Sequence, residues 1–337
     1  MKAKMAAGAQ PWLDDWKGLT NSPLAQLGFR PRPAEVVVRG QGVRGPNIML
    51  LTQSAHAAYL CAVRWKISGD EAYAKKAIDI LNAWSGTLKA VGGNSDRFLA
   101  VGIQGFQLAN SGEIMRTYPG WPAEDFQRFQ DMMLRVFYSA SHDFLLHHNG
   151  AVITNYMANW DTCNLSAMLA MGVLCDRRDI YDEAVAYFKN GGGNGAIRHA
   201  VTYLHPGYLG QWQESGRDQA HTQAGFGWLA NFCEVAWNQG DDLYGYDNNR
   251  LLSGAEYIAR YNLGKDVPWQ GYARNSGRRG PVVSYSVVSP AERGNLRPIY
   301  EMVYNHYVNR RGLDAPHVAQ AAAKNRPEGG PRPGHSP

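Results

Sequence analysis

The chain has 337 residues, of which 45% are apolar and 19% charged, so it can bury a large core and is neither disordered nor collagen-like. Its net charge of +5 suits an anionic ligand, but no basic helix or aromatic RNA-binding motif indicates nucleic acid as a partner. No apolar run of about 18 residues predicts a membrane span. The first residues lack the apolar stretch of a signal peptide, which predicts a cytoplasmic protein, or a secreted or periplasmic one if a leader has been removed.

The elements are predicted in chain order from periodicity and breaks. Residues 1–46 are rich in Pro and Gly and predict an N-terminal arm with one short strand in VVVRGQGVRGP. Apolar residues then recur at helical spacing, with short Gly-, Asn- and Pro-containing breaks. The predicted helices cover 49–65, 70–88, 98–118, 122–144, 155–175, 178–190, 194–204, 214–239, 248–262 and 296–312.

This pattern predicts an all-α fold of antiparallel helix pairs, forming one domain over 47–313 and followed by a flexible tail over 314–337. The irregular stretch between Gly264 and the last helix is long enough to suggest a functional loop. The four cysteines lie far apart within apolar helical segments, so they predict buried side chains and no metal site.

The densest polar cluster is GQWQESGRDQAHTQ, residues 210–223. Glu214, Arg217 and His221 are spaced i, i+3 and i+7, which places them on one face of the helix predicted over 214–239. Arg217 supplies a planar fork of donors that matches a carboxylate, and His221 titrates near neutral pH. A plain ion network that closes the helix end is the structural alternative.

A second cluster is TNYMANWDTCN, residues 154–164. On a helix, Asn155, Asn159 and Cys163 share a face at i, i+4 and i+8. Two asparagines on one helical face suggest hydrogen bonding to a ligand carboxylate, with capping or inter-helix hydrogen bonds as the alternative.

The long loop near the C-terminus offers phenols beside guanidinium groups. Tyr272 and Arg274 lie in QGYARN, and Arg297 and Tyr300 lie in LRPIYE. A neighbouring cation lowers the pKa of a tyrosine, which suits proton transfer. Among the weaker signals, GGGNG at 191–195 lacks the GK[ST] of a phosphate loop and predicts a flexible turn, and the histidine pair at 147–148 predicts a helix end.

Four stretches together resemble the alginate lyase family of polysaccharide lyases: FLAVGIQGFQLANSGEIMR, NWDTCNLSAMLAMGV, GQWQESGRDQAHTQAGFGWLANFCEVAWNQGDDLYG and RPIYEMVYNHY. The resemblance covers most of residues 47–310. It implies an incomplete (α/α) toroid and an acidic polysaccharide as the substrate. By residue type and order, Asn159 and Arg217 look like the family's Asn and Arg, which neutralise a uronate carboxylate.

The chain departs from better-known members of the family at the positions of the proton-transferring residues. Trp160 follows the Asn where those members have His, and His221 lies near the expected position of their Tyr. The resemblance then implies either that His221 has taken over proton abstraction or that the family's Tyr comes from the late loop. In the provisional assignment, His221 takes the proton at C5 of the sugar and Tyr272 protonates the leaving oxygen. Further substrate contacts are predicted for Gln107, Asn110, Trp160, Gln213, Arg274, Arg297 and Tyr300. No cofactor is implied, and the uronan and the oligomeric state stay open.

Two other functions are weighed against a lyase. An (α/α)-barrel glycoside hydrolase needs two carboxyl groups on opposite sides of the sugar. Glu214 could be paired with Asp161 or Asp218, but Glu214 and Asp218 are expected one turn apart on a single helix. The third reading is a toroid that binds acidic glycans without cleaving them.

Overall fold

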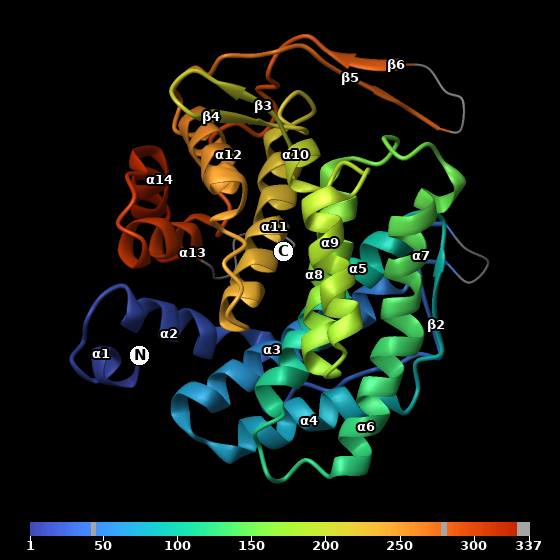
Figure 1. The fold of residues 1–337 in the computed structure, drawn as a ribbon. Coiled ribbons are helices and arrows are strands. Elements are labelled where there is room, and N and C mark those ends of the chain that lie inside the picture. The colour runs from blue at the N-terminus through green and yellow to red at the C-terminus, as the bar shows by residue number, and fades with distance from the viewer. Residues whose placement is uncertain (42–44, 278–281, 329–337) are drawn as a thin grey trace. The chain divides into compact units, whose positions relative to one another are not determined.

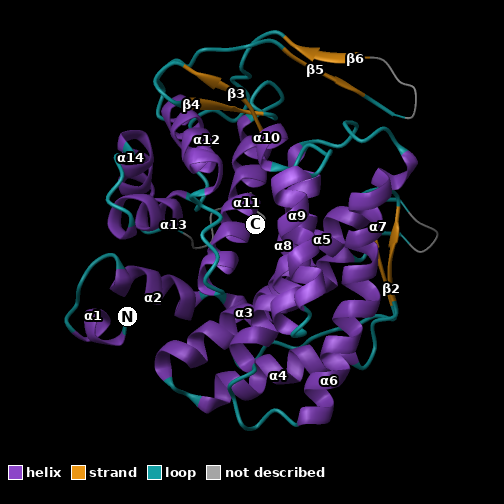
Figure 2. Cartoon of the chain, in the orientation of Figure 1, coloured by secondary structure: helices purple, strands orange, loops and turns teal. Residues whose placement is uncertain are grey.

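The computed structural model describes residues 1–41, 45–277 and 282–328, and most of them are helical (Figures 1 and 2). Packing within the chain separates two compact units. The first unit contains Met1–Phe144 and Ala170–Tyr181, and the second contains Leu145–Leu169 and Asp182–Glu328. The sequence predicts one domain over 47–313, whereas the packing divides that range between two units. No helix in the described residues is long and apolar enough to cross a membrane.

The elements of the first unit are mainly helices joined by short turns. They are α1 (Lys2–Ala6), α2 (Trp12–Asn21), a 3₁₀ turn (Pro23–Ala25), β1 (Val36–Arg39), α3 (Ile48–Ser68), α4 (Glu71–Ser85), β2 (Ala90–Gly93), α5 (Arg97–Met115), α6 (Ala123–Met132), a π-helical turn (Met133–Tyr138) and most of α7 (Ser139–His147). The end of α8 and the start of α9 also belong to this unit.

Local sequence explains where α3 ends and α4 begins. Gly69 has a φ of 80°, a left-handed conformation that ends α3. The carboxylate of Asp70 then accepts the Ala72 N–H at 3.0 Å and caps α4. The predicted arm is tied into the unit, because Val36–Arg39 pairs in parallel with Ala90–Gly93 and buries Val37 and Val38.

The second unit combines long helices with two antiparallel hairpins. Its elements are a 3₁₀ turn (His148–Gly150), most of α8 (Ala158–Leu174), most of α9 (Arg178–Asn190), α10 (Ile197–Ala200), β3 (Val201–His205), β4 (Leu209–Trp212), α11 (Gln219–Asn238), α12 (Tyr246–Asn262), β5 (Tyr272–Asn275), β6 (Val282–Tyr285), α13 (Tyr300–Tyr304), a π-helical turn (Asn305–Arg310) and α14 (Pro316–Asn325). Both hairpins lie at the same end of α11 and α12 (Figure 1).

Strand β4 packs closely against α12, and this contact sets the position of the turn that follows β4. A Cβ atom at Gly210 would lie 2.3 Å from the hydroxyl of Ser253 and 2.8 Å from the backbone nitrogen of Gly254. Only glycine allows the strand to approach the helix so closely.

Several predicted boundaries are wrong. The helix predicted over 194–204 is the short α10 followed by β3, which pairs with β4. The late loop contains the β5–β6 hairpin. The predicted flexible tail includes α14, because Val318, Ala321 and Ala322 are buried on the unit and give that helix an apolar face. Residues 329–337 of that tail lie outside the described residues, as do residues 42–44 of the predicted strand segment.

Candidate active site

Glu214, Arg217 and His221 do meet, but they do not share a helix face as predicted. Residues 213–217 form a turn after β4, and α11 begins only at Gln219. Asp218 is the cap of that helix: its backbone is extended, and its carboxylate accepts the His221 N–H at 2.7 Å. The turn therefore brings Glu214 and Arg217 to the N-terminal end of α11, where His221 stands in the first turn.

The contacts of His221 define its tautomer. Its Nδ1 lies 2.8 and 2.9 Å from the two carboxylate oxygens of Asp218, and its Nε2 lies 3.0 Å from Nη2 of Arg217. A guanidinium can only donate and a carboxylate can only accept. Nδ1 therefore carries the hydrogen, and Nε2 presents a lone pair. The side chain of His221 is 42% exposed, and in this structure the lone pair on Nε2 accepts a hydrogen bond from Arg217.

Asp218 is held as an anion. Burial alone would raise its pKa, but hydrogen bonds from the His221 ring and backbone, together with the charge of Arg217, lower the pKa below its usual value. Nε of Arg217 lies 3.4 Å from the Asp218 carboxylate. An ionised Asp218 therefore orients both the base candidate and the guanidinium.

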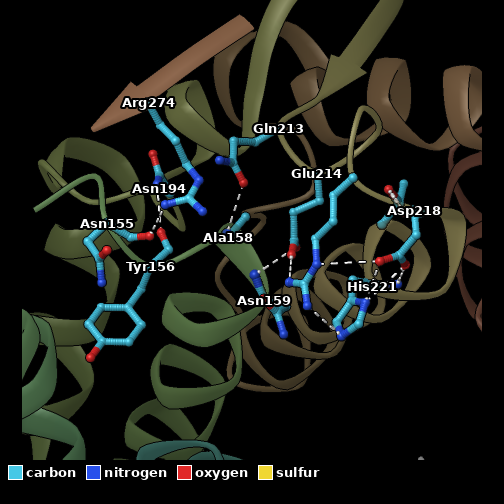
Figure 3. A network of polar contacts seen from close by, with 12 residues as sticks. Asn155, Tyr156, Ala158, Asn159, Asn194, Gln213, Glu214, Asp218, His221 and Arg274 are labelled. Carbon is cyan, nitrogen blue, oxygen red and sulfur yellow. Dashed lines mark hydrogen bonds and ion pairs between the residues drawn. The ribbon is translucent and has the colours of Figure 1, made fainter. Parts of the chain in front are cut away.

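Glu214 is a fully buried acid between two candidate substrate-binding residues. Its Oε1 accepts from Nη1 of Arg217 at 3.2 Å, and its Oε2 accepts the backbone N–H of Asn159 at 2.9 Å (Figure 3). Burial raises the pKa of Glu214 to about 8, although Arg217 and the Asn159 N–H act in the opposite direction. At neutral pH the side chain is therefore protonated, and Asp218 is the carboxylate that pairs with the charge of Arg217.

Asn159 lies in the first turn of α8, one residue after Ala158. Its side chain has no hydrogen-bond partner among the described residues, and its Oδ1 is buried. Asn155 does not share a helix face with it, because α8 begins after Asn155. Instead, Asn155 accepts hydrogen bonds from the Gly277 N–H, at 2.6 Å, and from the Arg274 guanidinium, so it anchors the late hairpin.

Tyr272 lies on β5 and is connected to the same group through Gln213. Oε1 of Gln213 accepts the Ala158 N–H at 3.0 Å (Figure 3). Its Nε2 donates to the Tyr272 hydroxyl at 3.0 Å. Neighbouring Gln213 and Glu214 thus satisfy the first two N–H groups of α8. The pKa of Tyr272 is raised by burial, although Gln213 and Arg274 lower it, so the neighbouring cation predicted to activate this phenol does not outweigh burial.

Three of the other predicted substrate contacts lie in the second unit. Trp160 is partly exposed, with its ring centroid 4.7 Å from that of Tyr156. Arg297 is partly buried, and this burial lowers its pKa. Tyr300 is fully buried and donates its hydroxyl to Gln223 at 2.9 Å. The predicted contact of Tyr300 with substrate is wrong, because it has no surface to offer.

Gln107 and Asn110 lie on α5 of the first unit. The backbone carbonyl of Gln107 accepts from Ser111, and the amide of Asn110 donates to the Phe106 carbonyl at 2.8 Å, as in an ordinary helix. Their substrate contacts stay predictions, as do those of Trp160, Arg274 and Arg297. The predicted contact of Gln213 with substrate is wrong, because Gln213 is buried and both ends of its amide bind within the chain.

The carboxyl pair of a glycoside hydrolase has no support here. The argument that Glu214 and Asp218 share a helix is wrong, but Glu214 and Asp161 are both fully buried, so neither can flank a sugar. No group of three or more His, Cys, Asp or Glu side chains within residues 1–41, 45–277 and 282–328 is arranged to hold a metal ion.

Two residues of the site were missed in the sequence. Asp218, which orients His221, could have been found, because an Asp three residues before the cluster's His is a typical helix cap. Asn194, which accepts a hydrogen bond from the Tyr272 hydroxyl at 3.4 Å, gave no signal, since 78 residues separate the two.

Arg217, His221 and Asn159 thus lie at the N-terminal ends of two helices, α11 and α8. A model of the alginate lyase family matches residues 30–269, and the chain belongs to this family. It is a polysaccharide lyase. A search of curated proteins finds no match.

Solved structures of alginate lyases share this fold. Alginate lyase A1-III from Sphingomonas species A1 is 13% identical over 94% of this chain and 87% of that chain, with a TM-score of 0.59. An alginate lyase from Bacteroides ovatus is 11% identical over 77% and 79%, with a TM-score of 0.53. A histidine-to-alanine variant of A1-III complexed with a tetrasaccharide is 16% identical over 72% and 68%, also at 0.53. The predicted all-α toroid fold class is confirmed.

Proposed function

We propose that this lyase cleaves an anionic, uronate-containing polysaccharide by β-elimination, with Asn159 and Arg217 binding the sugar carboxylate. Removal of the proton at C5 and loss of the C4 oxygen build enolate charge on that carboxylate, so donors must be aimed at it. The observation that carries the proposal is the convergence of Asn159 and Arg217 on the buried Glu214. Alginate lyases complexed with a tetrasaccharide support the substrate class.

Arg217 has donors to spare for a carboxylate. Of its five N–H groups, Glu214 and His221 accept one each, and Nε lies 3.4 Å from the Asp218 carboxylate. One N–H on Nη1 and one on Nη2 remain, which is the pair that binds a carboxylate in bidentate fashion. The amide of Asn159 adds a neutral donor without an internal partner. In such a site one preorganised donor contributes about 3 kcal/mol to stabilising the developing charge.

Two protons move in this reaction, and each is handled by a different group. His221 accepts the C5 proton at Nε2 once the bound carboxylate draws the Nη2 hydrogen of Arg217 away from that nitrogen. The Asp218 carboxylate holds Nδ1–H and stabilises the imidazolium that forms. Tyr272 donates to the departing C4 oxygen. The raised pKa of Tyr272 keeps the phenol protonated at neutral pH, which suits an acid rather than a base. Each group is expected to contribute about 10²- to 10⁴-fold.

The test is incubation with alginate, polyglucuronate and a neutral glycan. A lyase leaves an ultraviolet-absorbing unsaturated end on an acidic polymer, a hydrolase leaves reducing ends without that absorbance, and a binding protein leaves neither. Arg217→Ala and His221→Ala are expected to lose the absorbance while keeping the helical circular dichroism spectrum. His199→Ala, at an exposed histidine, is the matched control. Reducing ends without absorbance would refute the proposal.

A further inference from the structure

A buried polar cluster lies outside the groups assigned to the reaction. Asp161 is fully buried in α8, and its Oδ2 accepts from the Tyr187 hydroxyl at 3.0 Å and from the Gly195 N–H at 3.1 Å. Nε2 of the buried His148 lies 3.3 Å from Oδ1 of Asp161. One carboxylate therefore joins α8, α9, the end of α7 and the loop at 191–195. A buried carboxylate with this many partners fixes its surroundings.

The loop at 191–195 is GGGNG, and it is packed rather than flexible as predicted. A Cβ at Gly193 would lie 2.2 Å from both the Asp161 carboxylate and the Tyr187 hydroxyl. A Cβ at Gly195 would lie 2.3 Å from the Cβ of Asp161. Neither glycine has a positive φ, so the close approach to Asp161, not the backbone conformation, requires them.

Asn194, between these two glycines, is 3% exposed. Its Nδ2 donates to the carbonyl of Tyr156 at 2.7 Å (Figure 3). It also donates to the carbonyl of Thr154 at 3.1 Å, so both of its hydrogens are used. Its Oδ1 is left as an acceptor, and it faces the Tyr272 hydroxyl. Of the two ends of this amide, only the NH₂ can donate a hydrogen bond to a carbonyl. The carbonyls of Thr154 and Tyr156 therefore leave the oxygen of Asn194 to face the phenol.

The amide of Gln213, on the other side of the Tyr272 phenol, is oriented by its backbone contact in the same way. Oε1 of Gln213 accepts the Ala158 N–H, so its Nε2 is the end that faces Tyr272. The phenol oxygen thus meets one donor and one acceptor. Its hydrogen is directed to Asn194, and one of its lone pairs is directed to Gln213.

We propose that Asn194 is a positioning residue that holds Tyr272 as a neutral, oriented phenol, and that Asp161 keeps Asn194 in place through the glycine loop. This inference rests on the proposed function for its meaning, because a proton donor to the C4 oxygen must stay protonated and in place until that oxygen replaces Oδ1 of Asn194 as the acceptor of its O–H. The loop also holds residues 154–156, which lead directly into the start of α8 and Asn159.

The experiment separates positioning from catalysis. The protein is labelled with difluorotyrosine, whose ring fluorines bring phenol ionisation into a pH range where the fold persists, and titrated by ¹⁹F NMR. The Tyr272 resonance is assigned by its loss in Tyr272→Phe. Asn194→Ala is expected to lower its midpoint by about one pH unit, because the acceptor that favours the protonated phenol is lost.

Other charged and titratable groups that act on Tyr272 are Arg274, Tyr285 and Glu214, and they are unchanged in this variant. Asn262→Ala is the matched control: Asn262 is also buried and also bridges two segments through both ends of its amide. Asn262→Ala should lower the free energy of unfolding without moving the titration midpoint of Tyr272. An unmoved midpoint in Asn194→Ala would overturn the inference whatever the activity is.

Activity then tests the link to the reaction. Asn194→Ala is expected to lower kcat about tenfold with a smaller change in KM, and to lower it no further in the Tyr272→Phe background. Asp161→Asn should shift the midpoint in the same direction as Asn194→Ala, and an opposite shift would overturn the role of Asp161. If Tyr272→Phe keeps full activity, the acid assignment fails, while the ¹⁹F midpoint still decides whether Asn194 positions the phenol.

Discussion

Replacing Glu214 with Gln should change how stability depends on pH. The side chain is fully buried, and burial raises its pKa from the ordinary 4.5 to about 8. Between these two values the folded protein keeps a proton on Glu214 that the unfolded chain has released. Stability contributed by this proton is complete below the unfolded pKa and is lost as the pH rises to the folded one.

The size of this pH dependence is set by the single proton that Glu214 binds. In this window the free energy of unfolding of the wild type falls by about 1.4 kcal/mol per pH unit through Glu214 alone. Glu214→Gln lacks this contribution, so the variant should gain about 3 kcal/mol on the wild type between pH 5.5 and 7.5. Loss of the contact between Glu214 and Arg217 also changes the free energy of unfolding of the variant, by an amount that does not depend on pH in this range.

The assay is urea denaturation of both proteins at pH 5.5, 6.5 and 7.5, followed by circular dichroism. The difference between the two free energies of unfolding is plotted against pH, so that groups common to both proteins cancel. Glu124→Gln, at an exposed position on α6, measures the loss of a carboxylate without burial. A flat difference for Glu214→Gln would refute the conclusion that Glu214 is protonated at neutral pH.

Three further predictions concern activity. Above about pH 8, ionisation of Glu214 adds a negative charge beside Arg217. KM for a polyanion should therefore rise with pH in the wild type but not in Glu214→Gln. The same dependence of KM on pH in both proteins would contradict this. Arg217→Lys keeps the charge but loses the planar fork, and kcat/KM should fall about 10²- to 10³-fold; near-normal turnover would show that no bidentate contact is needed. His221→Ala should lower kcat by about 10²- to 10⁴-fold, whereas His199→Ala should not, and equal rates would assign the base to another residue.

The sequence predicted the helices better than the ends that build the site. Helices such as α3, α4 and α9 follow from apolar spacing and local caps, because those signals lie within a few residues of each other. The helix predicted from residue 214 begins only at Gln219, although Gly216 and Asp218 are residues typical of a turn and a helix cap. A Cβ at Gly216 would lie 2.5 Å from the Cβ of Tyr285, a contact that comes from the distant β6 strand.

The residue types of the site were predictable, but their contacts were not. Arg217 and His221 stood out because charged residues interrupt an otherwise apolar segment. The contacts of Asn194 with Tyr272, and of Gln213 with Ala158, join residues 78 and 55 positions apart. No local pattern encodes such pairs, since they depend on how the hairpins pack against the helices.

The most direct test of the carboxylate-binding claim is a structure of the Tyr272→Phe variant soaked with a uronate tetrasaccharide. The account predicts that one sugar carboxylate lies within hydrogen-bond distance of both the Arg217 guanidinium and the Asn159 amide, with C5 of that sugar facing Nε2 of His221. A bound tetrasaccharide whose carboxylates contact neither Arg217 nor Asn159 would contradict it.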